Sequence, residues 1–167
     1  MSPIKQGWEG RFLEDFSVGD VYRCRYGRTV TEADNIQFTL LTNNTNQIHF
    51  NRDYGERSGF GGCLVNSMLT LSIVVGMGVS DISENGVALG WEDVRLPAPV
   101  RPGDTLYSES EVLAVRESRS RPTQGIVTVK TRGYNQHGEM VIEMRRSVLV
   151  WKREHAPGRD IFPIPQA

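Results

Sequence analysis

A 17-residue segment from Cys63 to Val79 contains no charged side chain and is mainly apolar. It is too short and too rich in polar residues to span a membrane, because a spanning helix needs about 20 predominantly apolar residues. A helix that is apolar on nearly all sides is typical of a protein interior. We therefore expect Cys63–Val79 to form a buried central helix, around which the rest of the chain must fold.

Four segments after this helix have the composition of β-strands: Val87–Leu96, Thr105–Glu117, Gly125–Tyr134 and Met140–Lys152. Stretches rich in proline, glycine and other turn-forming residues separate them. Apolar and charged residues alternate most clearly in the last segment, as in a strand with one buried face. One uncharged helix followed by antiparallel strands predicts an α+β fold, with a sheet curled around a central helix.

The segments before the central helix are shorter. Residues 1–20 are expected to form an irregular lead-in, followed by a strand over Val21–Arg28. Thr31 is followed by acidic residues, which predicts a capped helix that ends near Leu41. A further helical turn is expected over Asn51–Arg57, before a group of glycines.

The chain of 167 residues has the size of one domain. We expect a lead-in over 1–20, a single domain over 21–153 and a proline-containing tail over 154–167, on the surface or crossing to a partner. A single open sheet also leaves an unpaired edge. Pairing with a second copy would cover that edge, so we expect a homodimer or a dimer-based oligomer.

Composition argues against several classes of function. The net charge is −1 and no basic cluster stands out, which argues against a nucleic-acid partner. No apolar run is long enough for a membrane span and no secretory signal is present, so we expect a cytoplasmic protein. Two cysteines, Cys24 and Cys63, do not form a disulfide framework. Metal-ligand spacings and nucleotide fingerprints are absent, which predicts no metal and no bound cofactor.

The residues best suited to chemistry lie just before the central helix. His49 is the strongest candidate, because the pKa of an unperturbed histidine lies close to neutral pH. It belongs to the segment Asn44-Thr-Asn-Gln-Ile-His-Phe-Asn51, and Phe60-Gly61 follows. The central helix is then opened by Val65-Asn-Ser-Met-Leu69. Such an arrangement combines an acid–base group with the free amides of a helix start.

This pattern resembles the signature of the MaoC-like (R)-specific enoyl-CoA hydratases, which have the hot-dog fold. In that family the sequence is Asp-x-Asn-Pro-Leu-His-x-Asp, followed by a Phe-Gly turn and Ala-His-Gly-Met-Leu. The resemblance extends from about Phe12 to Arg153 and implies that His49 is the catalytic histidine. Asn44 takes the place of the catalytic aspartate, and an amide cannot deliver a proton at neutral pH. Asn44 is therefore expected to orient the water while His49 transfers the protons.

The resemblance also implies a binding site for a CoA thioester, which is the expected partner molecule. Backbone N–H groups of Val65, Asn66 and Ser67 would stabilise the thioester oxygen at the helix start. Asn66 and Ser67 differ from the family pattern, and either side chain could instead cap the helix. The acyl chain is expected to pass Phe60 and Gly61.

A narrower resemblance concerns the substrate. Four segments, Phe38–His49, Val65–Ser67, Gly90–Pro97 and Glu117–Pro122, are similar to the branch that acts on branched C5-dicarboxyl CoA esters. Mesaconyl-CoA hydratase, also called β-methylmalyl-CoA dehydratase, and itaconyl-CoA hydratase are the activities of that branch. An amide at Asn44 fits this implication, because a carboxylate there would repel an anionic substrate.

Other interpretations remain open. A hot-dog thioesterase would use the same pocket to hydrolyse the thioester, and a non-catalytic acyl-CoA-binding protein would have lost the acid. Glu92 or Asp93 could replace the missing carboxylate, as could the carboxylate of the substrate, although a solvated strand end also explains the two residues. The arginine-rich loop could bind CoA phosphates or a substrate carboxylate, or be a solvated turn. It contains Arg116, Arg119 and Arg121.

Overall fold

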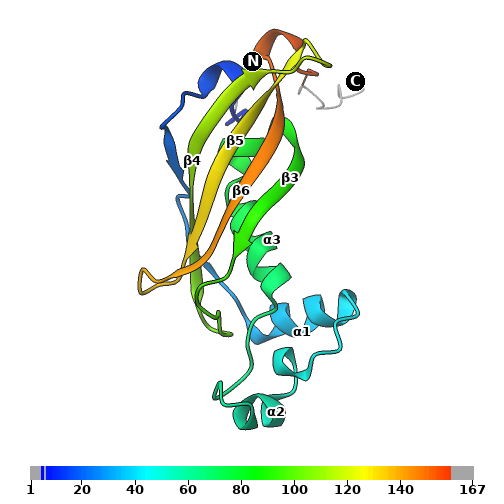
Figure 1. Cartoon of the computed structure of the whole chain (residues 1–167), viewed down its shortest axis with the longest axis vertical. Coiled ribbons are helices and arrows are strands. Elements are labelled where there is room, and N and C mark those ends of the chain that lie inside the picture. Colours follow the sequence, from blue (N-terminus) through cyan, green and yellow to red (C-terminus); the bar gives the residue numbers. More distant parts are fainter. Residues whose placement is uncertain (1–4, 6, 159–167) are drawn as a thin grey trace.

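The computed structural model describes residue 5 and residues 7–158. Its main feature is an antiparallel sheet in the order β1-β4-β5-β6-β3, with β2 paired to β4 (Figure 1). The strands are β1 (Val21–Arg23), β2 (Arg28–Thr29), β3 (Gly86–Arg95), β4 (Thr105–Glu117), β5 (Gln124–Tyr134) and β6 (Met140–Trp151). The helices are α1 (Glu32–Leu41), α2 (Arg52–Arg57) and α3 (Ser67–Met77).

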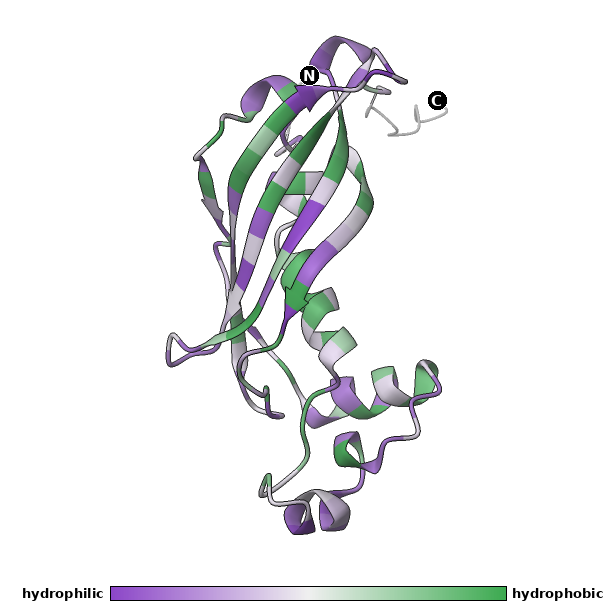
Figure 2. Cartoon of the chain, in the orientation of Figure 1, coloured by the Kyte–Doolittle hydropathy of each residue, from purple (hydrophilic) through white to green (hydrophobic). Residues whose placement is uncertain are grey.

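The sheet covers one side of α3, so the fold has a helix layer and a sheet layer. Figure 1 shows α3 running along the sheet, while α1 and α2 lie beyond one end of it. Figure 2 shows α3 in hydrophobic and neutral colours over most of its length, whereas α2 is largely hydrophilic. The predicted α+β arrangement of a sheet around a central helix is confirmed, and the periodicities of the two kinds of element account for it.

The core has two parts, one at each end of the sheet. The first packs α3 against β4 and β6, with Val74, Met77 and Met144 fully or almost fully buried. The second packs the lead-in against the other end of the sheet. There the lead-in contains a short 3-10 helix, Leu13–Asp15, and buries the side chains of Leu13 and Phe16. The lead-in is therefore more ordered than predicted, although residues 1–4 and 6 lie outside the described residues.

Gly133 on β5 allows α3 to approach the sheet closely. A Cβ atom at this position would lie 2.7 Å from a methyl group of Val74 and 2.6 Å from one of Ile142. Both neighbours are buried, so neither can move away without opening the core. The absence of a side chain at residue 133 thus sets the distance between the two layers.

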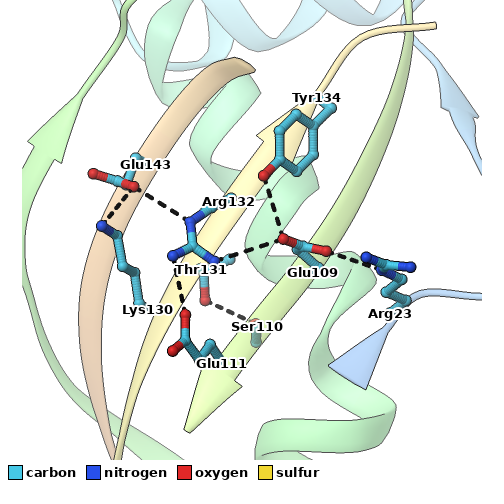
Figure 3. Close-up of polar contacts among 9 residues, drawn as sticks. All are labelled: Arg23, Glu109, Ser110, Glu111, Lys130, Thr131, Arg132, Tyr134 and Glu143. Atoms are coloured by element: carbon cyan, nitrogen blue, oxygen red, sulfur yellow. Dashed lines mark hydrogen bonds and ion pairs between the residues drawn. The ribbon is translucent and has the colours of Figure 1, made fainter. Parts of the chain in front are cut away.

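The outer face of the sheet carries a network of charged side chains (Figure 3). Arg132 forms ion pairs with Glu109, Glu111 and Glu143, at 3.6, 3.0 and 3.4 Å. Lys130 also pairs with Glu143 at 2.8 Å, and its hydrogen bond lowers the pKa of that carboxyl group. Positive and negative charges alternate across the strands, which is typical of a sheet face that meets water. The apolar side chains of these strands face α3.

Two predicted elements differ from the structure because long-range contacts intervene. The strand expected over Val21–Arg28 is divided into β1 and β2, since the chain turns between them. The central helix expected over Cys63–Val79 begins only at Ser67. The N–H groups of Leu64 and Val65 donate to the carbonyls of Ile48 and Val100, which keeps this part extended. A short π-helix, Val79–Ser83, follows the end of α3.

One side of α3 is exposed, contrary to the expectation that it is buried all round. Met68, Ser72 and Gly76 lie along this side, and Val79 in the π-helix continues the line at helical spacing. The most exposed apolar residue on this side, Met68, has 56% of its surface accessible to solvent. The chain itself therefore buries only part of the surface of α3. The exposed side is apolar enough to be covered by another molecule.

The start of α1 confirms the predicted cap. The Thr31 side chain accepts a hydrogen bond from the Asp34 N–H, and the Asp34 carboxylate accepts one from the Thr31 N–H at 2.8 Å. Asp34 also receives two hydrogen bonds from the guanidinium of Arg28, which ties α1 to β2. The hydrogen bond from Arg28, followed by those from Thr31, holds the pKa of this carboxyl group far below its ordinary range.

We expect Asp34→Asn to lower the free energy of unfolding by about 1 kcal/mol at pH 7, the usual magnitude for a lost cap. The folded-state pKa of Asp34 is lower than the unfolded value of about 3.9, so its stabilisation is present above that value. It is lost as the pH falls through the folded-state value. The difference between variant and wild type should therefore shrink below about pH 4 in urea titrations at several pH values.

Asp53→Asn is the matched control. Asp53 pairs with Arg57 one helical turn later, but both side chains are more than 70% exposed. Exposed pairs of this kind contribute about 0.5 kcal/mol or less. Equal destabilisation by both substitutions would contradict a special role for the Asp34 cap.

Candidate active site

His49 ends a short 3-10 helix, Gln47–His49, in the connection between α1 and α2. The Asn46 side chain starts this turn by accepting a hydrogen bond from the Ile48 N–H at 3.2 Å. Ile48 is buried and anchors the segment in the protein, while His49 is half-buried. Local turn chemistry and one apolar anchor thus fix the backbone at the histidine.

The His49 ring is held by a backbone carbonyl. Its Nδ1 atom lies 3.0 Å from the carbonyl oxygen of Leu64. A carbonyl can only accept a hydrogen bond, so Nδ1 must carry the hydrogen and donate it. The neutral ring then has an unprotonated Nε2 atom, which is free to accept a proton. This is the arrangement that a general base requires.

A cavity of about 300 Å³ lies beside this histidine. Four of the residues that line it are predicted site residues, namely His49, Phe60, Val65 and Ser67. The others are Leu64, Thr70 and the connection from Leu96 to Val100 that leads from β3 into β4. The lining is thus mostly apolar with a few polar groups, as is usual for a small-molecule site.

The three amides predicted to form an oxyanion site differ in their availability. The Val65 N–H donates to the carbonyl of Val100 at 2.8 Å. The Asn66 N–H donates to the side-chain oxygen of Asn35, also at 2.8 Å. Within the described part of the chain the Ser67 N–H has no acceptor, although it opens α3 at the edge of the cavity. Ser67 is therefore the amide that can face a developing negative charge.

Asn66 is the N-cap of α3. Its side-chain oxygen accepts a hydrogen bond from the Met68 N–H at 3.0 Å, and its NH₂ group lies 3.3 Å from the hydroxyl oxygen of Thr39. Only 2% of Asn66 is accessible. The side chain of Asn66 thus caps α3, which is one of the two roles expected of this residue; the other is a contact of its backbone N–H with the thioester oxygen. Asn66 and Gly61 are not among the residues that line the cavity.

Asn44 closes the turn before His49. Its side-chain oxygen accepts a hydrogen bond from the Asn46 N–H at 2.9 Å, which forms an Asx turn. Asn44 is half-buried and does not line the cavity. The expected catalytic roles of Asn44 and His49 stay predictions, and so does the role of Phe60 and Gly61 toward the acyl chain.

The other charged candidates lie away from the cavity. Glu92 and Asp93 are exposed on β3, where the pairing with β6 is irregular and Asp93 has a positive φ of 52°. Arg116 lies near the end of β4, and Arg119 and Arg121 lie in the loop that joins β4 to β5. This loop therefore lies at the opposite end of β4 from Val100, about 40 Å away for a 13-residue strand. The arginine loop therefore cannot contact the same acyl group as His49 within one copy, whereas Glu92 and Asp93 are simply not among the residues that line the cavity.

Two parts of the site are not predicted by the sequence. One is the connection from Leu96 to Val100, whose prolines were interpreted only as turn signals. The other is Asn35, a fully buried residue of α1 that forms hydrogen bonds with His49 and with the segment from Leu64 to Asn66. An asparagine inside an amphipathic helix is the only local signal for Asn35, and it does not reveal the distant partners.

The family model of the MaoC like domain matches residues 15–135. The chain belongs to the MaoC-like domain family. Among the curated relatives, mesaconyl-CoA hydratase of Cereibacter sphaeroides is 34% identical over 158 residues, which is 94% of this chain and 46% of that protein. β-Methylmalyl-CoA dehydratase of Chloroflexus aurantiacus is 36% identical over 153 residues, which is 90% of this chain and 43% of that protein.

Solved structures confirm the hot-dog fold. A MaoC domain protein dehydratase from Chloroflexus aurantiacus aligns with a TM-score of 0.85 and 32% identity, over 98% of this chain and 46% of that one. Rv0216 of Mycobacterium tuberculosis, described as a double hotdog fold, aligns with a TM-score of 0.79 at 19% identity, over 95% of this chain and 53% of its own. The chain thus spans about half the length of these four proteins.

Two further observations concern the described residues. None of their helices combines the length and the apolar character that crossing a membrane requires. Their His, Cys, Asp and Glu side chains also form no group of three that could hold a metal ion. The division at residues 20 and 153 and the need for no cofactor stay predictions. Residues 159–167 of the expected tail lie outside the described residues.

We expect Asn44→Ala to lower the free energy of unfolding by about 1 kcal/mol, because the Asx turn loses its acceptor. Asn44→Asp keeps an acceptor oxygen and should stay within about 0.5 kcal/mol of the wild type. Chemical denaturation of the three proteins at pH 7 measures both differences. An equal loss in both variants would show that the amide group itself, rather than the acceptor, holds the turn.

Proposed function

We propose that this chain adds water to, or removes it from, the α,β double bond of a short enoyl-CoA thioester. The observation that carries the proposal is the meeting of His49, with its unprotonated Nε2 atom, and the unpaired Ser67 N–H at one apolar cavity. The names of the two curated relatives support the reaction class. Because the chain spans about half the length of those relatives, the proposal for this chain depends on the geometry of its own site.

In this proposal the two groups act on opposite ends of the reacting system. The Nε2 atom of His49 takes a proton from the water that attacks the β-carbon, and it returns a proton to the α-carbon. Negative charge that develops on the thioester oxygen is stabilised by the Ser67 N–H and by the positive end of α3. Dehydration is the same sequence in reverse.

We further propose a C5-dicarboxyl substrate such as mesaconyl-CoA or itaconyl-CoA. Asn44 supports this choice, because an amide in place of the family's acid adds no negative charge near an anionic substrate. In this scheme Asn44 shapes the turn that carries His49 and transfers no proton. The name of the Cereibacter sphaeroides relative agrees with mesaconyl-CoA.

Incubation with mesaconyl-CoA, itaconyl-CoA and crotonyl-CoA tests the proposal. We expect loss of the enoyl absorbance without release of free thiol, and faster reaction of a dicarboxyl ester than of crotonyl-CoA. His49→Ala should lower kcat by on the order of 10²- to 10⁴-fold, the usual contribution of a general acid–base group. Free thiol would instead identify a thioesterase, and tight binding without turnover would identify an acyl-CoA-binding protein.

Asn44→Asp tests the choice of substrate separately. We expect this variant to lose kcat/KM toward dicarboxyl esters by about 10-fold, roughly the effect of one unfavourable charge interaction of 1.4 kcal/mol. Activity toward crotonyl-CoA, which lacks the second carboxylate, should fall less or rise. Unchanged turnover of the dicarboxyl esters would contradict a role for Asn44 in selecting them.

We also propose that a second copy pairs with β3. This strand lies at the edge of the sheet and is paired only with β6 among the described strands. Its exposed apolar side chains are Val87, Leu89, Trp91 and Val94, and the exposed line of α3 adds Met68 and Val79. An apolar edge strand is a template for pairing, and relatives of twice the length support a two-unit assembly.

Leu89→Glu is expected to shift the protein from dimer to monomer in sedimentation equilibrium, because it buries an unpaired charge in the proposed interface. Leu89 is 52% exposed in one copy, so the fold itself should tolerate the change. Val18→Glu is the matched control, since Val18 is 67% exposed in a turn away from β3. A wild-type monomer, or equal dissociation of both variants, would contradict pairing along β3.

A further inference from the structure

Asn35 is a buried amide whose polar atoms all contact the candidate site. It lies in α1 and is fully inaccessible to solvent. Its NH₂ group donates to the carbonyl of His49 at 2.7 Å and to the carbonyl of Leu64 at 2.9 Å. Its oxygen accepts a hydrogen bond from the N–H of Asn66 at 2.8 Å. One side chain thus links α1, the histidine turn and the start of α3.

The contact with Leu64 is the one that bears on chemistry. The Leu64 carbonyl accepts hydrogen bonds both from Asn35 and from Nδ1 of His49. A carbonyl oxygen has two lone pairs, so it can accept the hydrogen bonds of both donors at the same time. Asn35 therefore fixes the position of the acceptor that selects the Nδ1–H form of the His49 ring. The second donor contact holds the backbone of the same histidine.

The contact with Asn66 fixes the backbone at the start of α3. The Asn35 oxygen accepts from the Asn66 N–H, and the next residue, Ser67, lines the cavity. An amide side chain suits this position because two donors and one acceptor are required there. A carboxylate would offer no donor, and an apolar side chain would offer neither.

We propose that Asn35 is a positioning residue that sets the tautomer of His49 and aligns it with the Ser67 N–H. This proposal rests on the proposed function for its effect on catalysis. Its effect on the histidine ring does not need turnover. The two can therefore be tested separately in the same set of variants.

Asn85 provides a matched control. It is also buried, with 5% of its surface accessible, and its NH₂ group also donates to two carbonyls, those of Glu9 and Arg11, at 2.8 and 3.2 Å. These contacts hold the lead-in, which packs at the other end of the sheet from α1. Asn35→Leu and Asn85→Leu thus remove the same chemistry from two places.

The first measurement is the tautomer of His49, from the ¹⁵N chemical shifts of the ring in labelled protein, with His49→Gln to assign the signal. We expect a predominant Nδ1–H form in the wild type and in Asn85→Leu, and loss of this preference in Asn35→Leu. With an active enzyme, Asn35→Leu should lower kcat by about 10- to 100-fold, as for a displaced catalytic group, with KM within about 2-fold. The pH profile of kcat/KM should shift in Asn35→Leu alone.

Two results would overturn the proposal. One is an unchanged His49 tautomer in Asn35→Leu, and the other is an equal loss of kcat in the two leucine variants. If Asn35→Leu does not fold, Asn35→Asp replaces it, because it keeps the acceptor for Asn66 and loses both donors. A wild-type protein without turnover would contradict the proposed function, while the tautomer measurement would still decide the role of Asn35.

Discussion

Packing of α3 against the concave face of the sheet is the contact on which the other features depend. Val74 and Met77 meet the sheet at a distance that Gly133 permits, and the buried side chains of β4, β5 and β6 face the same helix. Charged residues on the opposite face of these strands pair with one another in water. The direction of α3 along the sheet then determines which end of the helix meets α1, and it is the end with unpaired amides that becomes the candidate site.

The two ends of α3 carry opposite partial charges, and the protein treats them accordingly. At the carboxyl end the buried guanidinium of Arg146 lies against Gly78, where a Cβ atom would be 3.0 Å from its Nη2. Two of its nitrogens have no acceptor among the described residues, and burial lowers its pKa to about 10, which leaves it charged at neutral pH. The negative helix end stabilises such a cation. At the amino end the first turn of α3 contains no acidic residue, so a ligand that gains negative charge suits that position.

Features that depend on neighbouring residues could be predicted from the sequence. The α1 cap at Thr31 and the bounds of β4 agree with the expectations, because capping and alternation are local properties. The expected start of α3 is too early, since the N–H groups of Leu64 and Val65 donate to carbonyls that are distant in the sequence. His49 could be singled out by its chemistry and by the family resemblance. Its tautomer could not, because a carbonyl 15 residues away selects it.

The position of β3 bears on how the cavity is closed. One wall of the cavity is the connection from Leu96 to Val100, which begins directly after the exposed edge strand β3. Anything that pairs with β3 must therefore also lie close to this wall. The apolar edge strand β3 and the cavity are consequently adjacent. Pairing along β3 would therefore affect the access of water to the cavity.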